Sequence, residues 1–566
     1  MSLLVDLFGY LSIVLHGLTI VAQSMALGGV LFLLFLARPF QASLPDGAGL
    51  ARRTAAIAGW SALALVLCEA VTVAMQSAVL MDTLSLPFQG VAGANFAVAG
   101  MVKMAAAAAL AACMFTRQPV PGAALLGLVG VTVIAATLTT HSVARLHGGT
   151  VLFAASALHI LGAAIWIGGI PCFVMALGRL HDGAAFRRVG ARFSRMSMAG
   201  VGCILLSATV FSVMYIGAWN GVYGTAYGVM VSAKAAMFGA LLLLGLGNFL
   251  VVARLRRDPA ASVLRMRRFA EVEIGIGCSI FFAAASLTSV PPAVDLMQDR
   301  VVWAEIAERN TPRMPRLVSP DHDALALPAL QAQLDAEAAE KQAAPPQAFV
   351  PGSGDLPARN AADVAWSEYN HHWSGLFVVL IGALGLAHRA GVRWAKHWPL
   401  ALLGLAAFLF LRSDPEVWPL GEIGFWESLR DVEVLQHRVF VILIVAFALF
   451  EWGVRTGRLR DPRAALVFPL LTALGGALLL THSHAIANVK DQLLIELSHT
   501  PLALAGIAAG WSRWLELRAD SPVRRVAGWV WPVCFLVVGA ILLSYREAQP
   551  LSAYYSIVGV NVQTFG

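Results

Sequence analysis

Histidines are the residues of this sequence with the clearest capacity for chemistry, and ten of the fourteen are predicted on the outer side of a membrane. Neutral imidazole is the commonest protein ligand for copper, iron and zinc. Polar side chains are costly in hydrocarbon unless they are paired or coordinated, so several at one depth suggest a shared function. The ten are His16, His141, His147, His159, His371, His372, His437, His482, His484 and His499.

Two of these histidines, His16 and His159, are predicted well inside the bilayer. Each lies about ten residues below the outer end of its helix, which is roughly 15 Å deep at about 1.5 Å per residue. Two histidines on facing helices can supply the axial ligands of a b-type haem. They can equally bind Cu(I), which accepts two or three soft or imidazole ligands. We therefore expect His16 and His159 to hold a metal ion or a haem.

A second candidate site is predicted farther along the chain, at or just below the outer surface. Its histidines are His437, His482, His484 and His499, with His371 and His372 at the outer start of another helix and His141 at the outer mouth of the first group. Copper could be bound by any of these, whereas His437 and His499 are the expected haem ligands among them. The alternative is that each histidine is only solvated or hydrogen-bonded to a neighbouring carbonyl.

Two lysines and a glutamate are also predicted inside the bilayer. Lys103 and Lys234 lie about eight residues below the outer surface, where lysine usually snorkels or finds an acidic or carbonyl partner. Glu69, near mid-depth of the second helix, is a candidate partner. A structural lysine–glutamate pair is favoured over a proton relay. Glu271 and Glu273, which begin a later helix on the inner side, are expected to face water.

The composition explains why a membrane is the expected solvent for these groups. The chain of 566 residues is 58% hydrophobic and 13% charged, with a mean hydropathy of +0.73, whereas soluble domains carry about 25% charged residues. The net charge of +7 comes from basic residues in short loops between apolar runs. That distribution is typical of membrane topology and argues against a nucleic-acid partner. The six cysteines are scattered through apolar runs and predict no disulfide framework.

Fourteen apolar segments are long enough to be considered as membrane-spanning helices. Eight come first, at about 7–37, 54–81, 95–116, 121–141, 149–178, 196–216, 227–253 and 270–290. Six follow, at about 373–388, 397–411, 434–454, 464–482, 492–512 and 526–544. The sequence therefore predicts an all-α integral membrane protein with about fourteen transmembrane helices.

Basic loops set the predicted orientation. Arginines crowd the loops near 179–195 and 254–268, whereas the alternate loops 82–94 and 217–226 contain no lysine or arginine. The positive-inside rule places the basic loops in the cytoplasm. Both termini are then expected on the periplasmic side of a bacterial inner membrane.

The stretch 294–370 differs from the rest because it is rich in proline, alanine and acidic residues, which indicates an external linker. It separates an eight-helix membrane domain, residues 1–293, from a six-helix membrane domain, residues 371–546. Residues 547–566 are expected to form an external tail.

The eight-helix domain shows a weak internal repeat. Residues 94–103 align without gaps to 225–234, which places Lys103 opposite Lys234. Residues 15–29 align with 158–169 over a short gap, which places His16 opposite His159. Two four-helix copies of the same orientation are predicted, related by an axis along the membrane normal. A similar spacing joins His141 to His159 and His482 to His499.

Residues 192–293 carry a set of features that resembles the CopD copper-resistance family. They are a T-x-Y-G at Thr225, Tyr227 and Gly228, a lysine nine residues after that threonine at Lys234, Asn248 near the helix end, Glu271 opening the next helix, and the closing Pro291 and Pro292. The segment 159–170 is similar to the family's preceding helix. The resemblance covers roughly residues 7–293, and the C-terminal helices resemble extended forms of the family.

The resemblance implies copper resistance or copper uptake across the inner membrane, beside a periplasmic copper carrier of the CopC kind. Two other functions stay open. The histidine pairs could bind haem b in a transmembrane oxidoreductase, perhaps one that reduces cupric ion, or the chain could be an assembly scaffold with structural histidines. No nucleotide-binding loop is visible, so drive by ATP within this chain is not expected.

Overall fold

The computed structural model describes residues 2–44, 46–84, 87–140, 148–180, 182–258, 260–296, 300–320, 361–429, 432–481 and 489–547. Within these ranges every extended regular element is a helix, and the only strand-like pairing is an isolated bridge between Val417 and Ile423. The predicted all-α membrane fold is therefore confirmed. Two compact units are present, one built mainly from Met1–Gln298 and the other mainly from Asp299–Gln347, Ser353–Leu479 and His484–Gly566.

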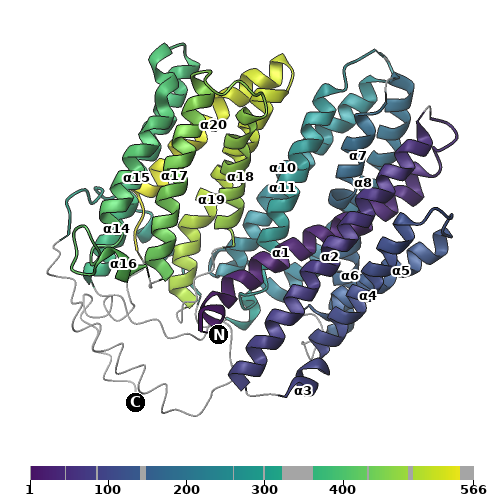
Figure 1. The fold of residues 1–566 in the computed structure, drawn as a ribbon, viewed down its shortest axis with the longest axis horizontal. Helices are drawn as coiled ribbons and strands as arrows, with labels where there is room; N and C mark the ends of the chain where they lie inside the picture. The colour runs from purple at the N-terminus through teal and green to yellow at the C-terminus, as the bar shows by residue number, and fades with distance from the viewer. Residues whose placement is uncertain are drawn as a thin grey trace. The chain divides into compact units, whose positions relative to one another are not determined.

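The first unit is the purple-to-teal part of the ribbon in Figure 1. Its long helices are α1 (Ser2–Phe32), α2 (Gly47–Leu84), α4 (Asn95–Phe115), α5 (Gly122–Leu138), α6 (Gly149–Ala163), α7 (Ile170–Leu177), α8 (Gly183–Phe211), α10 (Ala226–Arg254) and α11 (Leu264–Leu287). The short helices α3 (Phe88–Ala92) and α9 (Trp219–Tyr223) lie in the connections before α4 and α10.

The second unit is drawn mostly in green and yellow. It contains α12 (Trp303–Arg309), α14 (Ala361–Arg389), α15 (Ala401–Arg412), α16 (Phe425–Ser428), α17 (Val432–Arg455), α18 (Val467–Leu479), α19 (Val489–Arg518) and α20 (Ser521–Leu543). A 3-10 segment, η6 (Arg393–Leu400), leads into α15, and Pro399 lies inside it.

Twelve helical segments of the described chain are long and apolar enough to cross a bilayer. Two further predicted spans correspond to the shorter apolar helices Gly122–Leu138 and Ala464–Leu479. Helices are the expected solution because lipid offers no hydrogen bonds, so each backbone group must be satisfied within its own segment. The total of fourteen spans and the predicted domain boundaries stay predictions.

Three helices of the first unit contain a π-helical segment, where the backbone hydrogen bond lengthens by one residue. They are η1 (Leu33–Ala37) after α1, η2 (Ala164–Gly168) between α6 and α7, and η3 (Ser212–Ile216) after α8. Single π-turns inside α-helices occur frequently at functional sites. η2 matters most here, because it interrupts the helix that carries His159.

Helix α1 crosses η2 at glycines, with backbone lying directly on backbone. A Cβ atom on Gly28 would overlap Ala164 O and the backbone of Gly168, and a Cβ atom on Gly168 would overlap Ser24 O. Small residues allow membrane helices to approach this closely, which replaces the hydrophobic driving force that lipid removes. Gly28 and Gly168 belong to the two aligned sequence segments, so the segments that resemble each other also pack on each other.

The second unit uses the same device. Helices α14 and α20 pack through Gly375, whose Cβ position lies 2.9 Å from Gly539 O, and through Gly382, at 2.9 Å from Pro532 O. Helices α18 and α19 meet at Gly476, whose Cβ position lies 2.7 Å from Ala503 O. Glycine at these three positions lets the helices approach this closely.

The glycine crossing predicts a sharp difference between two Gly→Ala substitutions. Gly168→Ala should destabilise the protein by at least about 2 kcal/mol, since overpacking a tight contact forces the backbone apart. Gly127→Ala on α5, where a Cβ would meet nothing within 4 Å, should be neutral or stabilising because alanine favours helix. The midpoint of thermal unfolding in detergent measures both, and equal midpoints would contradict the crossing.

Candidate functional site

His159 on α6 is oriented by α8. Its Nδ1 lies 2.9 Å from Ser207 Oγ, and its ring lies 5.5 Å from that of Phe211. Ser207 is fully buried and donates its one hydroxyl proton to Ile204 O at 2.9 Å. His159 Nδ1 must therefore be the donor to Ser207 Oγ. The imidazole is then the tautomer with its lone pair on Nε2, which is the form that binds a metal.

Lys234 of α10 lies near enough to His159 to act on it electrostatically. The sequence contains no aspartate or glutamate between Asp182 and Asp258, so neither α8 nor α10 can offer this lysine a carboxylate. His159 therefore has the side chain of Lys234 near it and no carboxylate from α8 or α10.

Lys103, the residue aligned with Lys234, has a different environment. Its Nζ lies 2.8 Å from Glu69 Oε2, and both side chains are buried between α2 and α4. The lysine–glutamate pair expected from the sequence is present. Gly100 lets the helices approach there, because its Cβ position lies 3.2 Å from Glu69 Oε1.

His16 is half-buried on α1, and the helix around it packs against α11, where Gly17 faces the ring of Phe282. The crossing of α1 with η2 comes twelve residues after His16 and nine residues after His159. At about 1.5 Å per residue, the two histidines lie roughly 18 Å and 14 Å from that crossing along their helices.

Glu273 corrects one expectation. It was predicted to face water, yet its side chain is only 3% exposed and accepts a hydrogen bond of 2.5 Å from Asn248 Nδ2. Trp166, inside η2, donates a second hydrogen bond. Glu271 is partly buried in an ion pair with Arg268 at 2.5 Å. The signal missed in the sequence was Asn248, a polar residue near the end of the apolar helix that packs on α11.

His437 in the second unit pairs with a carboxylate that sequence reasoning did not single out. Its Nδ1 lies 2.6 Å from Oδ1 of the buried Asp414, which also accepts from Ser413 Oγ at 2.9 Å. A carboxylate on one ring nitrogen fixes the ring and raises the basicity of the other, as in carboxylate–histidine–metal arrangements. Asp414 follows the end of α15 and comes 23 residues before its partner, so no local spacing reveals the pair.

His371 and His499 are brought together around Tyr545. Their ring centroids are 6.4 Å apart, and Tyr545 stacks on His371 at 3.8 Å and meets His499 edge-on at 6.0 Å. His371 Nδ1 donates to Ser367 O at 2.7 Å, and His499 Nδ1 donates to Ile495 O at 3.0 Å. Both rings are therefore held as the tautomer with the lone pair on Nε2.

His372 plays a different part from its neighbour His371. Its Nδ1 accepts a hydrogen bond of 2.7 Å from Arg316 N, and its Nε2 donates to Tyr545 O at 2.9 Å. Both ring nitrogens are thus occupied by backbone groups. The buried imidazole joins the segment around Arg316 to the segment after α20, which is a structural task.

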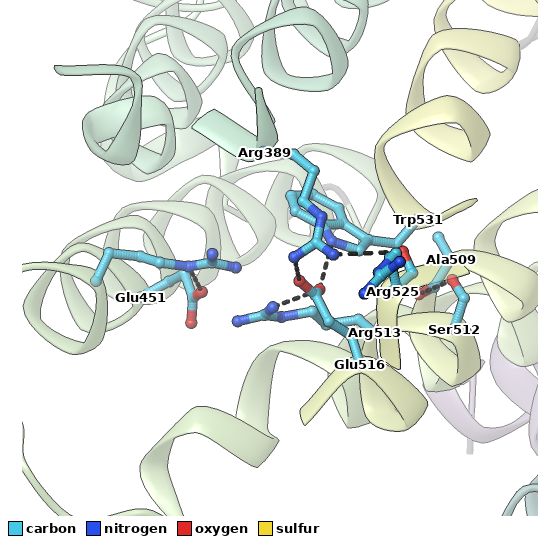
Figure 2. A network of polar contacts seen from close by, with 9 residues as sticks. Arg389, Glu451, Ala509, Ser512, Arg513, Glu516, Arg525 and Trp531 are labelled. Atoms are coloured by element: carbon cyan, nitrogen blue, oxygen red, sulfur yellow. Dashed lines mark hydrogen bonds and ion pairs between the residues drawn. The ribbon is translucent and has the colours of Figure 1, made fainter. Parts of the chain in front are cut away.

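An arginine–glutamate network lies at the other end of the second unit (Figure 2). Glu516 receives Arg513 Nη1 at 2.5 Å, Trp531 Nε1 at 2.8 Å and Arg389 Nη1 at 3.3 Å. Arg455 pairs with Glu451 at 2.6 Å. Carboxylates and aromatic rings together hold these arginines, since Arg455 and Arg513 also lie over the ring of Trp531.

The predicted sites are only partly within the described chain. His141, His482 and His484 lie outside the described residues. Among the residues that are described, no three histidine, cysteine, aspartate or glutamate side chains gather closely enough to hold a metal ion. His371 and His499 are two described histidines whose rings lie near each other, with centroids 6.4 Å apart.

Comparison with known proteins gives two partial matches. Residues 187–287 match the protein family described as Copper resistance protein D, CopD. The "Copper transport protein CutJ" of Bacillus subtilis (strain 168) is 31% identical over 137 residues, 24% of this chain and 24% of that protein. The chain therefore aligns with about a quarter of the length of this curated relative. No solved structure matches. The family match spans most of α8 and all of α10 and α11, which carry Ser207, Lys234 and Glu273.

The Lys103–Glu69 pair predicts a non-additive mutational cycle. Lys103→Met alone should destabilise the protein by about 3 kcal/mol or more, because it leaves a buried carboxylate without its counter-ion. Adding Glu69→Leu should restore much of that loss, since the apolar pair carries no buried charge. Thermal unfolding in detergent of both single variants and the double variant tests this. Simple addition of the two single effects would contradict a coupled pair.

Proposed function

We propose that this chain, a CopD-family membrane protein by its residues 187–287, handles copper in a bacterial inner membrane. One observation carries the proposal. Ser207, on a helix of the matched segment, fixes His159 on the preceding helix as a neutral ligand with its lone pair on Nε2. The name of the related protein, Copper transport protein CutJ, supports copper as the metal.

The intramembrane site is proposed at His159 with His16 as its second ligand. Cu(I) accepts two imidazole ligands and needs no third donor. This fits helices whose other side chains at that depth are mostly apolar. The nearby Lys234 would make the site weak for a cation, and a transport site must release what it binds. A lysine beside the site therefore favours transport of copper ions over their long-term binding.

The outer histidines of the second unit are proposed to form a separate copper-binding site. His371 and His499 present rings in the ligand tautomer, and His437 is backed by Asp414. A periplasmic copper carrier of the CopC kind would then deliver the ion, which requires the outer side and both termini to face the periplasm.

A haem between His371 and His499 is the second candidate, since their 6.4 Å separation is close to that of two axial imidazoles about 2 Å from one iron. Tyr545 argues against it. Its ring stacks on His371 at 3.8 Å and lies against His499, so it occupies space beside both rings that a porphyrin would need. A single copper ion requires no such space.

Copper binding should depend on His159 and on its hydroxyl partner to different degrees. In purified protein loaded with Cu(I) against a competing chelator, His159→Ala or His16→Ala should lower the copper stoichiometry. Ser207→Ala should keep the stoichiometry and weaken the affinity by about 10–100-fold, the usual effect of losing a hydrogen-bond partner of a ligand.

His397→Ala is the matched control, because His397 accepts a hydrogen bond from Trp452 at 2.8 Å and lies near the opposite end of its unit's helices from the proposed outer site. It should leave copper binding unchanged. Wild-type stoichiometry and affinity in both His16→Ala and His159→Ala would remove the intramembrane site from the proposal.

The second unit separates ligand from structural histidines. The double variant His371→Ala, His499→Ala should lose the copper of the outer site and keep the intramembrane copper, with an unfolding midpoint near that of the wild type. His372→Ala should keep the copper and lower the midpoint, because it leaves Arg316 N without its acceptor. An optical spectrum of the same wild-type sample tests for haem. A Soret band that the double variant lacks would show that His371 and His499 bind haem, which contradicts a site that holds only copper.

A further inference from the structure

Glu273 is a buried carboxyl group that the copper site does not use. It lies nine residues into α11, about 14 Å along the helix at about 1.5 Å per residue. Its side chain is 3% exposed and is surrounded by α10, which contributes Asn248, and by η2, which contributes Trp166. One turn farther along α11, Gly277 faces Ile167 of η2, so these two segments are in tight contact.

One polar atom beside Glu273, the side-chain oxygen of Asn248, has no hydrogen-bond donor among the described residues. Asn248 Nδ2 donates to Glu273 Oε1 at 2.5 Å, while Asn248 Oδ1 is buried and has no partner among the described residues. An unsatisfied buried acceptor is costly. A proton on Glu273 Oε2 would supply the missing donor, since an amide and a carboxylic acid can close a ring of two hydrogen bonds.

Glu273 also lacks a counter-ion. No described side chain forms an ion pair with it. The elements that pack against α11 are α1, α7, α10 and η2. Besides Glu273, the titratable or charged residues of these elements and of α11 itself are Asp6, Tyr10, His16, Cys172, Tyr227, Lys234, Arg254, Arg265, Arg267, Arg268, Glu271 and Cys278. Lys234 lies fourteen residues from Asn248, about 21 Å along α10. Arg267 and Arg268 are both directed to Glu271, at 3.6 Å and 2.5 Å.

The other buried carboxyl group of the first unit shows the contrast. Glu69 has Lys103 Nζ at 2.8 Å and is matched as an ion. Glu273 has two neutral donors and an oxygen that needs a proton. An isolated carboxylate in a membrane interior is expensive, and the group is neutralised instead.

We propose that Glu273 is a proton-binding site: in this conformation it is a neutral carboxylic acid that donates from Oε2 to Asn248 Oδ1. Losing the proton leaves a carboxylate that keeps its donors Asn248 and Trp166 but returns Asn248 Oδ1 to an unsatisfied state. Because Trp166 belongs to η2, in the same continuous helix as His159, the proton site and the proposed copper site share one structural element.

Coupling to copper follows from this and rests on the proposed function. A copper cation bound at His159 adds positive charge to a low-dielectric bundle, which favours the ionised form of Glu273. Copper entry would then expel the Glu273 proton, and copper release would recover it. In this way, exchange of a proton for a copper ion would provide energy for copper transport without a nucleotide.

The protonation state can be measured without copper. Infrared spectra of the purified full-length protein in lipid nanodiscs at neutral pH should contain the C=O stretch of a protonated carboxylic acid that Glu273→Gln removes. The glutamine can form the same two hydrogen bonds with Asn248, so this variant should fold with an unchanged unfolding midpoint. Asn248→Leu should keep the band and shift it to higher frequency, because the acid loses its hydrogen-bond partner.

Glu69→Gln is the matched control and should leave the acid band in place, since Glu69 is paired with Lys103. An acid band identical in wild type and Glu273→Gln overturns the proposal, because Glu273 is then ionised. If Glu69→Gln removes the band instead, the proton is on Glu69, and the proposal for Glu273 is overturned as well.

A copper arm tests the coupling and is read separately. Cu(I) is added to weakly buffered protein, and bound copper and released protons are both counted. Glu273→Gln should bind copper and release about one proton fewer per copper, as expected when a single titrating group is removed. Equal proton release overturns the coupling. No copper bound by the wild type defeats the proposed copper function, while the infrared result still decides the state of Glu273.

Discussion

The packing of the first unit depends on the backbone contact between Gly28 on α1 and Gly168 at the end of η2. Neither position has room for a Cβ atom, so the crossing fixes how far apart α1 and the helix of His159 can be and how they are rotated. In lipid this closeness is the main source of attraction between apolar helices. The positions of His16 and His159, and the contact of η2 with α11 that buries Trp166, all follow from it.

Charged side chains inside the helices of the two units are compensated to different degrees. Lys103 has the carboxylate of Glu69. Arg455 has Glu451 and lies 5.2 Å and 5.6 Å from the rings of Trp398 and Trp531. Lys234 has no carboxylate on α8 or α10 and instead lies near His159. Charge that is fully compensated stabilises one arrangement. Incompletely compensated charge marks the part of the protein where an ion or proton can change the balance.

The sequence predicted the helices well, because a run of about twenty apolar residues has one stable solution in a bilayer. It also predicted the Lys103–Glu69 pair, since two opposite charges at neighbouring depths have few alternatives. It did not predict the burial of Glu273. That residue was expected to face water because it lies near the start of its helix, whereas its burial depends on how α11 is rotated against α10. Tyr545 and Asp414 were missed for a related reason. Both follow helix ends, and only tertiary packing brings them to their histidines.

The pair of Lys103 and Glu69 has a consequence for how the chain enters the membrane. Moving one charged residue at the centre of a helix into lipid costs about 2.5–3.5 kcal/mol, and α2 and α4 each carry one. Released separately during synthesis, each helix would bear that cost alone. Released together, they enter as a neutral hairpin, since only the short helix α3 and a few residues separate them. The ribosome-bound chain should therefore hold α2 at the insertion machinery until α4 has emerged, so the buried ion pair sets the order of membrane insertion.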